Sequence, residues 1–446
     1  MGNSKSREPT GVVDPAEIKL KSVFEAFTTD QTEEPLERRE LPLTAFATCF
    51  AAGGTEYGTT FADSIRPYIP SHEQIPVNPF VHLGKQVMGM SSPAERLEYF
   101  WRVFAGGGAE LSKDELTKML ITCYRLSIHS SGFGEQIEEF GRCDEIVKSI
   151  VESVWPKESY KIDKSLFFAW CQKNTSFIFS GTHSWTNGIW SQLDFRSQCA
   201  KCPSHAIIED IKTGSYLLSV QYLWMLSCNL PHAYRQSAGV SEVISPMEAN
   251  SWNKLSEILH WTNLYSSYLQ GMSLNTLNFH IFSYKEPTIM LLKLEQGHLY
   301  CIGVDEEWKV GSQRWGGHSC IVIQLLPQLR IVQTGANMLF YNTETRGLPK
   351  GIQFGKDTKS VMLEIDEDMT TVKHYGVPLQ LKVCEVWACG SPAARNAQMQ
   401  QQQWEKKEVE KHKNRKLKVE DWKDNPDRQL LNMGGVNVDH QETDRG

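Results

Sequence analysis

The chain has 446 residues, of which 40% are hydrophobic and 22% are charged, an ordinary composition for a globular protein with sizeable cores. Its 46 basic against 53 acidic residues give a net charge of −7, which argues against a protein that coats nucleic acid by charge alone. No apolar run approaches the roughly 18 residues that span a bilayer, and the first residues lack the apolar core of a signal peptide. Eleven cysteines without a secretion signal favour free thiols in a reducing compartment. A secreted protein, a single-pass receptor and a disulfide scaffold are therefore not expected.

The first residues, MGNSKS, fit a motif for N-myristoylation. Gly2 would present an unhindered α-amine after methionine removal, and Ser6 stands where the motif requires a hydroxyl residue. One myristoyl chain binds membranes only marginally, and the basic Lys5 and Arg7 add about 1 kcal/mol each on an anionic surface. The sequence predicts a flexible, myristoylated segment over 1–13, whose anchoring is reversible or needs a second contact.

Helical spacing of apolar residues dominates the first half of the chain. It predicts helices at 15–27, 94–104, 112–126, 141–155, 163–173 and 215–230. Ser112 and Glu115 form a capping box at the start of one of them, whereas four prolines in 66–80 predict a loop. We therefore expect a helical domain over 14–180, followed by a helical connector over 181–240.

The helices expected at 94–104 and 112–126, with Leu111 in the loop between them, resemble an EF-hand. Calcium needs six or more oxygen ligands, yet this loop offers only Glu115 at a ligand position, and the helix pair around 160–163 is equally poor. Two interpretations remain open, an EF-hand-like scaffold that has lost its metal and a calcium sensor. We predict no metal site here.

Cys199 and Cys202 form a lone CxxC motif. A structural zinc site needs four ligands, and His183, His205 and His232 are spaced irregularly around this motif. Zinc binding, redox exchange and ordinary loop cysteines remain as alternatives.

After about residue 250 the apolar pattern becomes that of strands, preceded by a short helix expected at 252–261. Strands are expected at 288–294, 298–304, 320–326, 329–334, 339–341, 361–365 and 383–388. Turn residues 295–297 and the pair Pro327 and Gln328 would close two hairpins. This spacing indicates an antiparallel sandwich or barrel, so the predicted fold class is α+β.

The stretch 260–390 resembles a TLDc domain. Its motifs occur in the family's order: a small Ser-bearing turn before a helix (GMSLNTL), a hairpin containing Gly-His, a Trp after it, a Phe-Gly segment and a closing Glu-Val-Trp strand. The positions that carry these motifs are Gly271, Ser273, Gly297, Trp308, Gly355, Glu385 and Trp387. The resemblance implies an antiparallel β-sandwich flanked by helices, which we place at 241–390.

The chain departs from the family pattern at two places. Where many members have an acidic residue in a Gly-x-Gly-Glu-x-Phe run, this chain has His318, and the segment 360–363 lacks the Gly-Leu-Trp of other members. Any chemistry carried by that acid in the family is in doubt here.

No catalytic motif was found inside this domain. Ser273 lacks the second glycine of a nucleophile elbow, and HExxH, Walker A and strand-linked GxGxxG motifs are absent from the sequence. Whether His260, His298 and His318 approach one another cannot be decided from their spacing. We predict no catalytic residue and no cofactor.

The composition changes again after Gly390. Residues 391–424 predict a long helix, and 425–446 a disordered tail; the stretch 406–418 holds seven Lys or Arg and two Glu. A helix this polar gains little by packing on its own domain, so it is either solvated or docks on a partner. The residues expected to make that contact are Trp404, Lys411, Arg415, Lys418, Val419 and Trp422. Basic helices with Trp also suit calmodulin or anionic lipid.

The resemblance, with the myristoylation motif and the C-terminal helix, points to a branch of the family linked to lysosomes and mTOR signalling. It implies a non-enzymatic regulator that binds the cytosolic V1 sector of the vacuolar-type proton-pumping ATPase through the TLDc domain and C-terminal helix. The expected location is the cytoplasmic face of the lysosomal membrane and the cytoplasm, with the mTOR complex and calmodulin as further candidate partners and no nucleic acid. Two alternatives are an oxidation-resistance thiol enzyme and a calcium/calmodulin-responsive adaptor acting through the basic helix. The thiol enzyme would need an exposed cysteine of low pKa.

Overall fold

The computed structural model describes residues 14–29, 33–52, 54–69, 73–136, 138, 142–156, 159–193, 207–208, 211, 215–235, 253–357, 361–414 and 433. Residues up to Ala394 belong to one compact unit, and those from Arg395 onward to a second. Of the helices in these described ranges, none is both long and apolar enough to cross a membrane.

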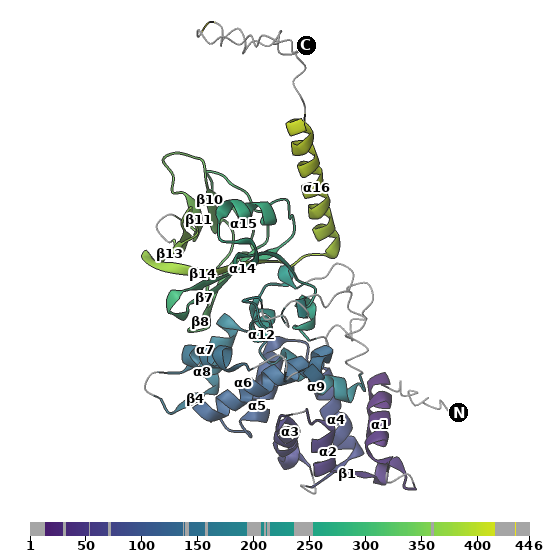
Figure 1. Ribbon diagram of the computed structural model, residues 1–446. Helices are drawn as coiled ribbons and strands as arrows, with labels where there is room; N and C mark the ends of the chain where they lie inside the picture. The colour runs from purple at the N-terminus through teal and green to yellow at the C-terminus, as the bar shows by residue number, and fades with distance from the viewer. Residues whose placement is uncertain are drawn as a thin grey trace, which may run out of the picture. The chain divides into compact units, whose positions relative to one another are not determined.

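The first half of the chain is helical (Figure 1). Its main helices are α1 (Pro15–Phe27), α2 (Leu43–Cys49), α3 (Tyr57–Ile65), α4 (Val77–Met88), α5 (Pro93–Phe104), α6 (Lys113–Ile128), α7 (Asp144–Val154), α8 (Lys164–Asn174), α9 (Ser180–Trp190) and α12 (Val220–Asn229). The helices expected from the apolar spacing are all present. No individual helix was predicted at α2, α3 or α4, and α9 lies almost entirely in the stretch expected as a helical connector. The capping box of Ser112 and Glu115 is confirmed at the start of α6.

Two short antiparallel ribbons tie these helices into pairs. Strand β1 (Glu40–Pro42) pairs with β2 (Gln74–Pro76), and β3 (Glu110–Ser112) pairs with β4 (Lys161–Asp163). The central residue of each strand is apolar and buried. Each ribbon therefore joins two helix–strand–helix units. The first ribbon joins the two units formed by α1 to α4, and the second joins the two units formed by α5 to α8.

The prediction of a loop over 66–80 is wrong. The described part of this range holds the turn η3 (Arg66–Tyr68), strand β2 and the first turn of α4. Pro76 is the N-cap of α4 and Pro79 lies in its first turn, where backbone N–H groups have no partner within the helix. Prolines here start a helix.

The second half builds one ten-stranded antiparallel sheet. Its strands are β5 (Thr262–Ser266), β6 (Thr288–Leu294), β7 (Leu299–Val304), β8 (Ile321–Leu326), β9 (Arg330–Thr334), β10 (Leu339–Asn342), β11 (Gly351–Phe354), β12 (Leu363–Ile365), β13 (Thr371–His374) and β14 (Val377–Ala388). The order is β10-β11-β12-β13-β14-β6-β7-β8-β9, with β5 also on β14. The predicted α+β class is confirmed, and the seven predicted strands are present. The helix expected at 252–261 is reduced, in its described part, to the single turn η7 (Ser256–Ile258).

The long strand β14 gives the sheet its curled shape. Its first residues pair with β13 and the remainder pairs with β6 and β5, with an irregularity in the β6 pairing between Leu381 and Val383. The sheet thus has two halves that share this strand. An apolar core that draws on both halves includes Met290, Ile302, Leu339 and Phe354.

Strand β6 is buried on both faces, which explains its nearly continuous apolar run. Side chains alternate between faces along a strand. Ile289 and Leu291 belong to a core shared with the helices, whereas Met290 and Leu292 belong to the core of the curled sheet. The helical half and the sheet are therefore stabilised by common burial.

Hydrogen bonds also fasten the helices to the hairpin of β8 and β9. The Ser149 hydroxyl on α7 donates to the Leu325 carbonyl, and the Leu329 amide donates back to the Ser149 carbonyl at 3.2 Å. At the end of α8, the Asn174 side-chain oxygen accepts the Ile331 amide at 3.0 Å. These contacts fix the helices and the sheet as one body.

Candidate partner-binding sites

Glu385 lies at the junction between the sheet and the helices. Its carboxylate is fully buried and accepts hydrogen bonds from the backbone amides of Leu217 and Leu218 and, at 3.1 Å, from the Trp387 indole. Burial raises the pKa of this carboxyl, and the three donors act in the opposite direction. Tyr216 packs edge-on against Trp387, with ring centroids 5.2 Å apart. Glu385 and Trp387 therefore hold the chain before α12 against the sheet.

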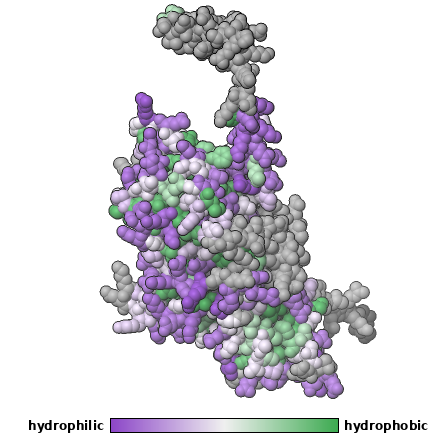
Figure 2. Space-filling model, viewed as in Figure 1, coloured by the Kyte–Doolittle hydropathy of each residue, from purple (hydrophilic) through white to green (hydrophobic). Residues whose placement is uncertain are grey.

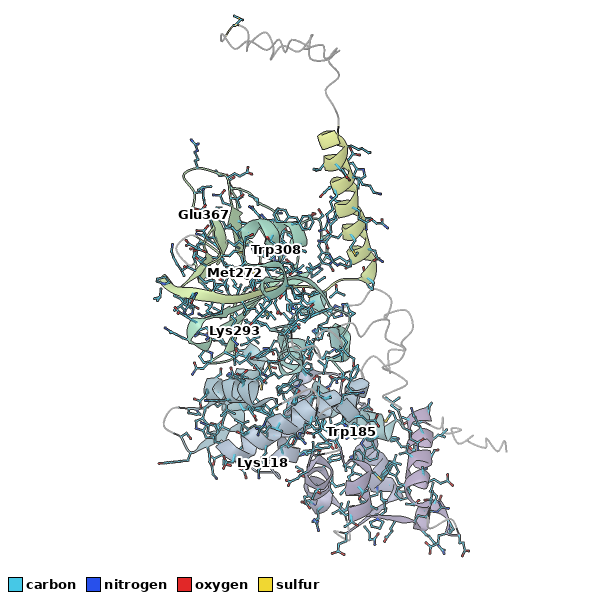
Figure 3. The ribbon with its side chains drawn as sticks, viewed as in Figure 1. Lys118, Trp185, Met272, Lys293, Trp308 and Glu367 are labelled. Atoms are coloured by element: carbon cyan, nitrogen blue, oxygen red, sulfur yellow. The ribbon has the colours of Figure 1, made fainter. Side chains whose placement is uncertain are left out.

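Trp308 lies in the core of the curled sheet. Its indole donates to the Thr288 hydroxyl at 2.9 Å and meets Trp315 edge-on, with ring centroids 5.7 Å apart (Figure 3). Gly355, after β11, donates its amide to the Met338 carbonyl at 2.8 Å. Trp308 and Trp315 therefore pack in the core enclosed by the curled sheet, and Gly355 bonds the chain beside it.

Gly271, Ser273 and Gly297 direct the chain at turns. Gly271 ends helix α14 (Ser267–Gln270) with φ +79° and Gly297 has the same φ at the β6–β7 turn, a conformation that favours glycine. The Ser273 hydroxyl caps α15 (Leu274–Ile281) by accepting the Thr276 amide at 3.1 Å. Their positions are those of structural residues.

The loop that lacks the family's acid is organised by Asp305, which sequence reasoning missed. Its carboxylate accepts the amides of Gly317 and Ser319 at 2.8 Å each and the Cys320 thiol at 2.9 Å. His318, at the position of the acid, is exposed. The loop therefore contacts a carboxylate, but this carboxylate belongs to Asp305, which precedes the loop in the chain.

The C-terminal helix α16 (Pro392–Asn414) carries the exposed residues expected to meet a partner. Trp404 is 63% exposed, and it stands on a helix whose side chains are largely hydrophilic (Figure 2). Lys411 is exposed and forms an ion pair with Glu408 at 2.6 Å. The other residues of the prediction, Gly2, Arg415, Lys418, Val419 and Trp422, lie outside the described residues.

Comparison with known protein families matches residues 242–390 to the TLDc domain. The chain therefore contains a region similar to the TLDc domain. Among curated proteins it is similar to the MTOR-associated protein MEAK7 of Homo sapiens, with 25% identity over 172 residues, 34% of this chain and 38% of that protein. The proteins of the same name from Gallus gallus and Xenopus laevis are each 29% identical, over 116 and 103 residues. The Gallus gallus match covers 25% of this chain and 25% of the relative, and the Xenopus laevis match covers 22% of each. The chain therefore aligns with less than two fifths of the length of each relative.

The three histidines singled out in the TLDc domain do not form one cluster. His260 is buried and bonds the Cys389 carbonyl at 2.8 Å, and His318 is exposed. His298 instead faces His374, a residue that sequence reasoning missed. No group of three or more His, Cys, Asp or Glu that could hold a metal is found within the described ranges.

The thiols of the TLDc domain are poorly suited to thiolate chemistry. Cys301, Cys320 and Cys384 are buried, and burial raises the pKa of each. A reactive thiol needs the opposite shift and access to solvent. Cys199 and Cys202 lie outside the described residues, so the alternatives for their motif stay open.

Proposed function

We propose that this TLDc protein is a non-enzymatic regulator that binds the cytosolic V1 sector of the vacuolar-type proton-pumping ATPase through its TLDc domain and C-terminal helix. The observation that carries the proposal is the exposed Trp404 on a long polar helix. Trp is a frequent energetic anchor of protein interfaces, and its large apolar surface gains most from burial against a partner. The name of the relatives supports participation in mTOR-associated signalling as part of the same proposal.

The first unit supports a second, rigid contact. Because helices and sheet share a core and the hydrogen bonds of Ser149 and Glu385, the TLDc domain presents a fixed surface to the pump. Two contacts joined in one chain raise the overall affinity by effective concentration. The TLDc domain would then set the position of the protein, and α16 would add affinity.

Membrane association is part of the proposal. Acylation of Gly2 would give weak, reversible attachment to the cytoplasmic face of the lysosome, which binding to the pump would reinforce. We also propose that the ribbon-linked helix pairs are EF-hand-like scaffolds. The antiparallel pairing of β1 with β2 and of β3 with β4 supports that kinship.

The experiment is a pull-down of the purified pump with the full-length chain, with Trp404→Ala and with a truncation after Ala394, which keeps the first unit. We expect Trp404→Ala to weaken binding about tenfold or more, because loss of a Trp anchor costs about 2 kcal/mol. Val409→Ala is the matched control, since Val409 is also exposed on α16 but smaller. Its binding should change by less than about threefold.

The outcomes separate the two contacts. Loss of binding on truncation makes α16 the main anchor, whereas unchanged binding places the affinity in the TLDc domain and rejects the role of Trp404. Failure of the full-length chain to bind the pump contradicts the proposed function.

A further inference from the structure

A cluster of aromatic and basic side chains joins the two halves of the curled sheet. His374 on β13 and His298, immediately before β7, have ring centroids 5.0 Å apart. The Tyr300 hydroxyl meets Nε2 of His374 at 2.6 Å, and the His298 ring lies nearly parallel to the Tyr300 ring. These residues are brought together only by the curl of the sheet.

Arg330 on β9 adds a permanent positive charge to the cluster. Its Nε donates to the side-chain oxygen of Gln324 on β8 at 2.7 Å, and its charge reaches both Tyr300 and His374. Arg330 is exposed and the two histidines are partly exposed, so a solute can approach. The cluster therefore combines one cation with two imidazoles at an accessible position.

The carboxylates on the neighbouring strand and turn are bonded to groups outside the cluster. Glu364 on β12 pairs with Lys373 at 2.8 Å, and Glu295 accepts the Gln380 amide at 3.1 Å. Tyr375 packs edge-on against His374 at 4.8 Å. Across the described residues, no ion pair to Arg330, His298 or His374 is found.

His298 has an unused polar atom. Its Nδ1 is buried and lacks a hydrogen-bond partner among the described atoms. An unpaired buried polar atom is costly, and a turn of the partly exposed His298 ring towards an acceptor on a bound ligand would remove that cost when Nδ1 carries the proton. Because Arg330 repels cations, the expected ligand is an anion.

We propose that His298, His374 and Arg330 form a binding site for a small tetrahedral oxyanion of the sulfate or phosphate type, taken from solution. Arg330 supplies the permanent charge and the imidazoles supply N–H donors. An oxyanion also relieves the repulsion that arises when the His374 imidazole is protonated beside Arg330. This site is independent of the proposed contact with the proton pump.

Binding and protonation are coupled at this site. Burial, the neighbouring His298 and Arg330 lower the pKa of His374, so this ring is mainly neutral near pH 7. An anion that binds the protonated ring more tightly must raise its pKa, and affinity must then increase as the pH falls. If the anion raises the pKa of His374 by about one, the protonated ring binds the anion about tenfold more tightly than the neutral ring does. Sulfate is the suitable probe because its charge stays constant between about pH 7.5 and about pH 5.5, the range in which histidine titrates.

The test titrates the full-length protein with sulfate, against chloride at equal ionic strength, and follows the histidine ring signals by NMR. We expect shifts at His298 and His374 that saturate, with affinity at least about threefold higher near pH 5.5 than near pH 7.5. His374→Gln and Arg330→Gln should abolish the saturable shifts of the remaining ring signals. Exposed residues of the same domain provide matched controls, His318→Gln and Arg346→Gln, which should leave the titration unchanged.

Two results would overturn the proposal. One is the absence of saturable shifts in the wild-type protein at either pH. The other is equal sulfate binding by the wild type and by Arg330→Gln, whose exposed position makes misfolding an inadequate explanation. Neither result bears on binding to the pump.

Discussion

Replacing Glu385 by alanine is expected to lower the free energy of unfolding by about 3 kcal/mol. The substitution leaves the Leu217 and Leu218 amides and the Trp387 indole buried without their acceptor, at about 1 kcal/mol or more for each donor. It also leaves a space at this fully buried position, which the surrounding side chains fill only in part. Because this carboxylate joins the chain before α12 to the sheet, that junction should open first.

Chemical unfolding followed by Trp fluorescence measures the effect. Glu385→Gln keeps one acceptor oxygen and removes the burial cost of a charge, so its loss should be clearly smaller than that of alanine. Glu367→Ala is the control, because Glu367 forms an exposed ion pair with Lys350 (Figure 3). A loss below about 1 kcal/mol for Glu385→Ala would show that the three donors find other partners.

The strands that could be predicted are those whose local pattern agrees with their environment. Strand β6 matches its predicted bounds because an apolar run is closed by the turn Glu295–Gly297. Strands β11 and β13 were missed; β13 includes the polar residues Lys373 and His374, which weaken its apolar pattern. Their conformation depends on pairing with neighbours in the sheet, which a local window does not reveal.

The helical half shows the same limit. Helix α1 matches its predicted bounds, with an Asp14 cap, a proline start and a clear apolar face. The ribbon of β1 and β2 was missed because its strands have three residues each, and Pro76 of β2 lies in a stretch that was predicted as a loop. It is defined by pairing between distant parts of the chain, with Leu41 opposite Ile75 at its centre.

Contacts over long sequence separations decide the sites as well. Glu385 was predicted as a motif residue, but its partners at Leu217 and Leu218 lie 168 and 167 residues earlier. His374 carried no sequence signal, because it meets Tyr300 only after the sheet curls. Asp305 could have been noticed as an acid shortly before the glycine-rich loop that lacks the family's own acid.

Acidification from about pH 6.5 to about pH 3 is expected to lower the free energy of unfolding by about 4 kcal/mol through His183 alone. This residue of α9 is 1% exposed, and its Nε2 lies 3.0 Å from the Val87 carbonyl, to which it donates as a neutral ring. Burial and the nearby Arg96 charge lower its pKa to about 3. The unfolded chain, with a histidine pKa of about 6.5, therefore binds a proton that the folded protein does not. The contribution of His183 to the free energy of unfolding is fully present above the pKa of the unfolded chain. It is lost as the pH falls towards the pKa of His183 in the folded protein.

Urea unfolding at a series of pH values tests this prediction. His183→Gln keeps an amide donor for the Val87 carbonyl but cannot titrate, so its stability should fall less steeply between about pH 6.5 and about pH 4. His318→Gln is the matched control, because it makes the same substitution at an exposed position. Equal slopes for the wild type and His183→Gln would mean that the folded protein protonates this ring and that acid acts on other groups. A shallower slope in His183→Gln alone would identify the contact between α9 and α4 as the acid-sensitive point of the helical half.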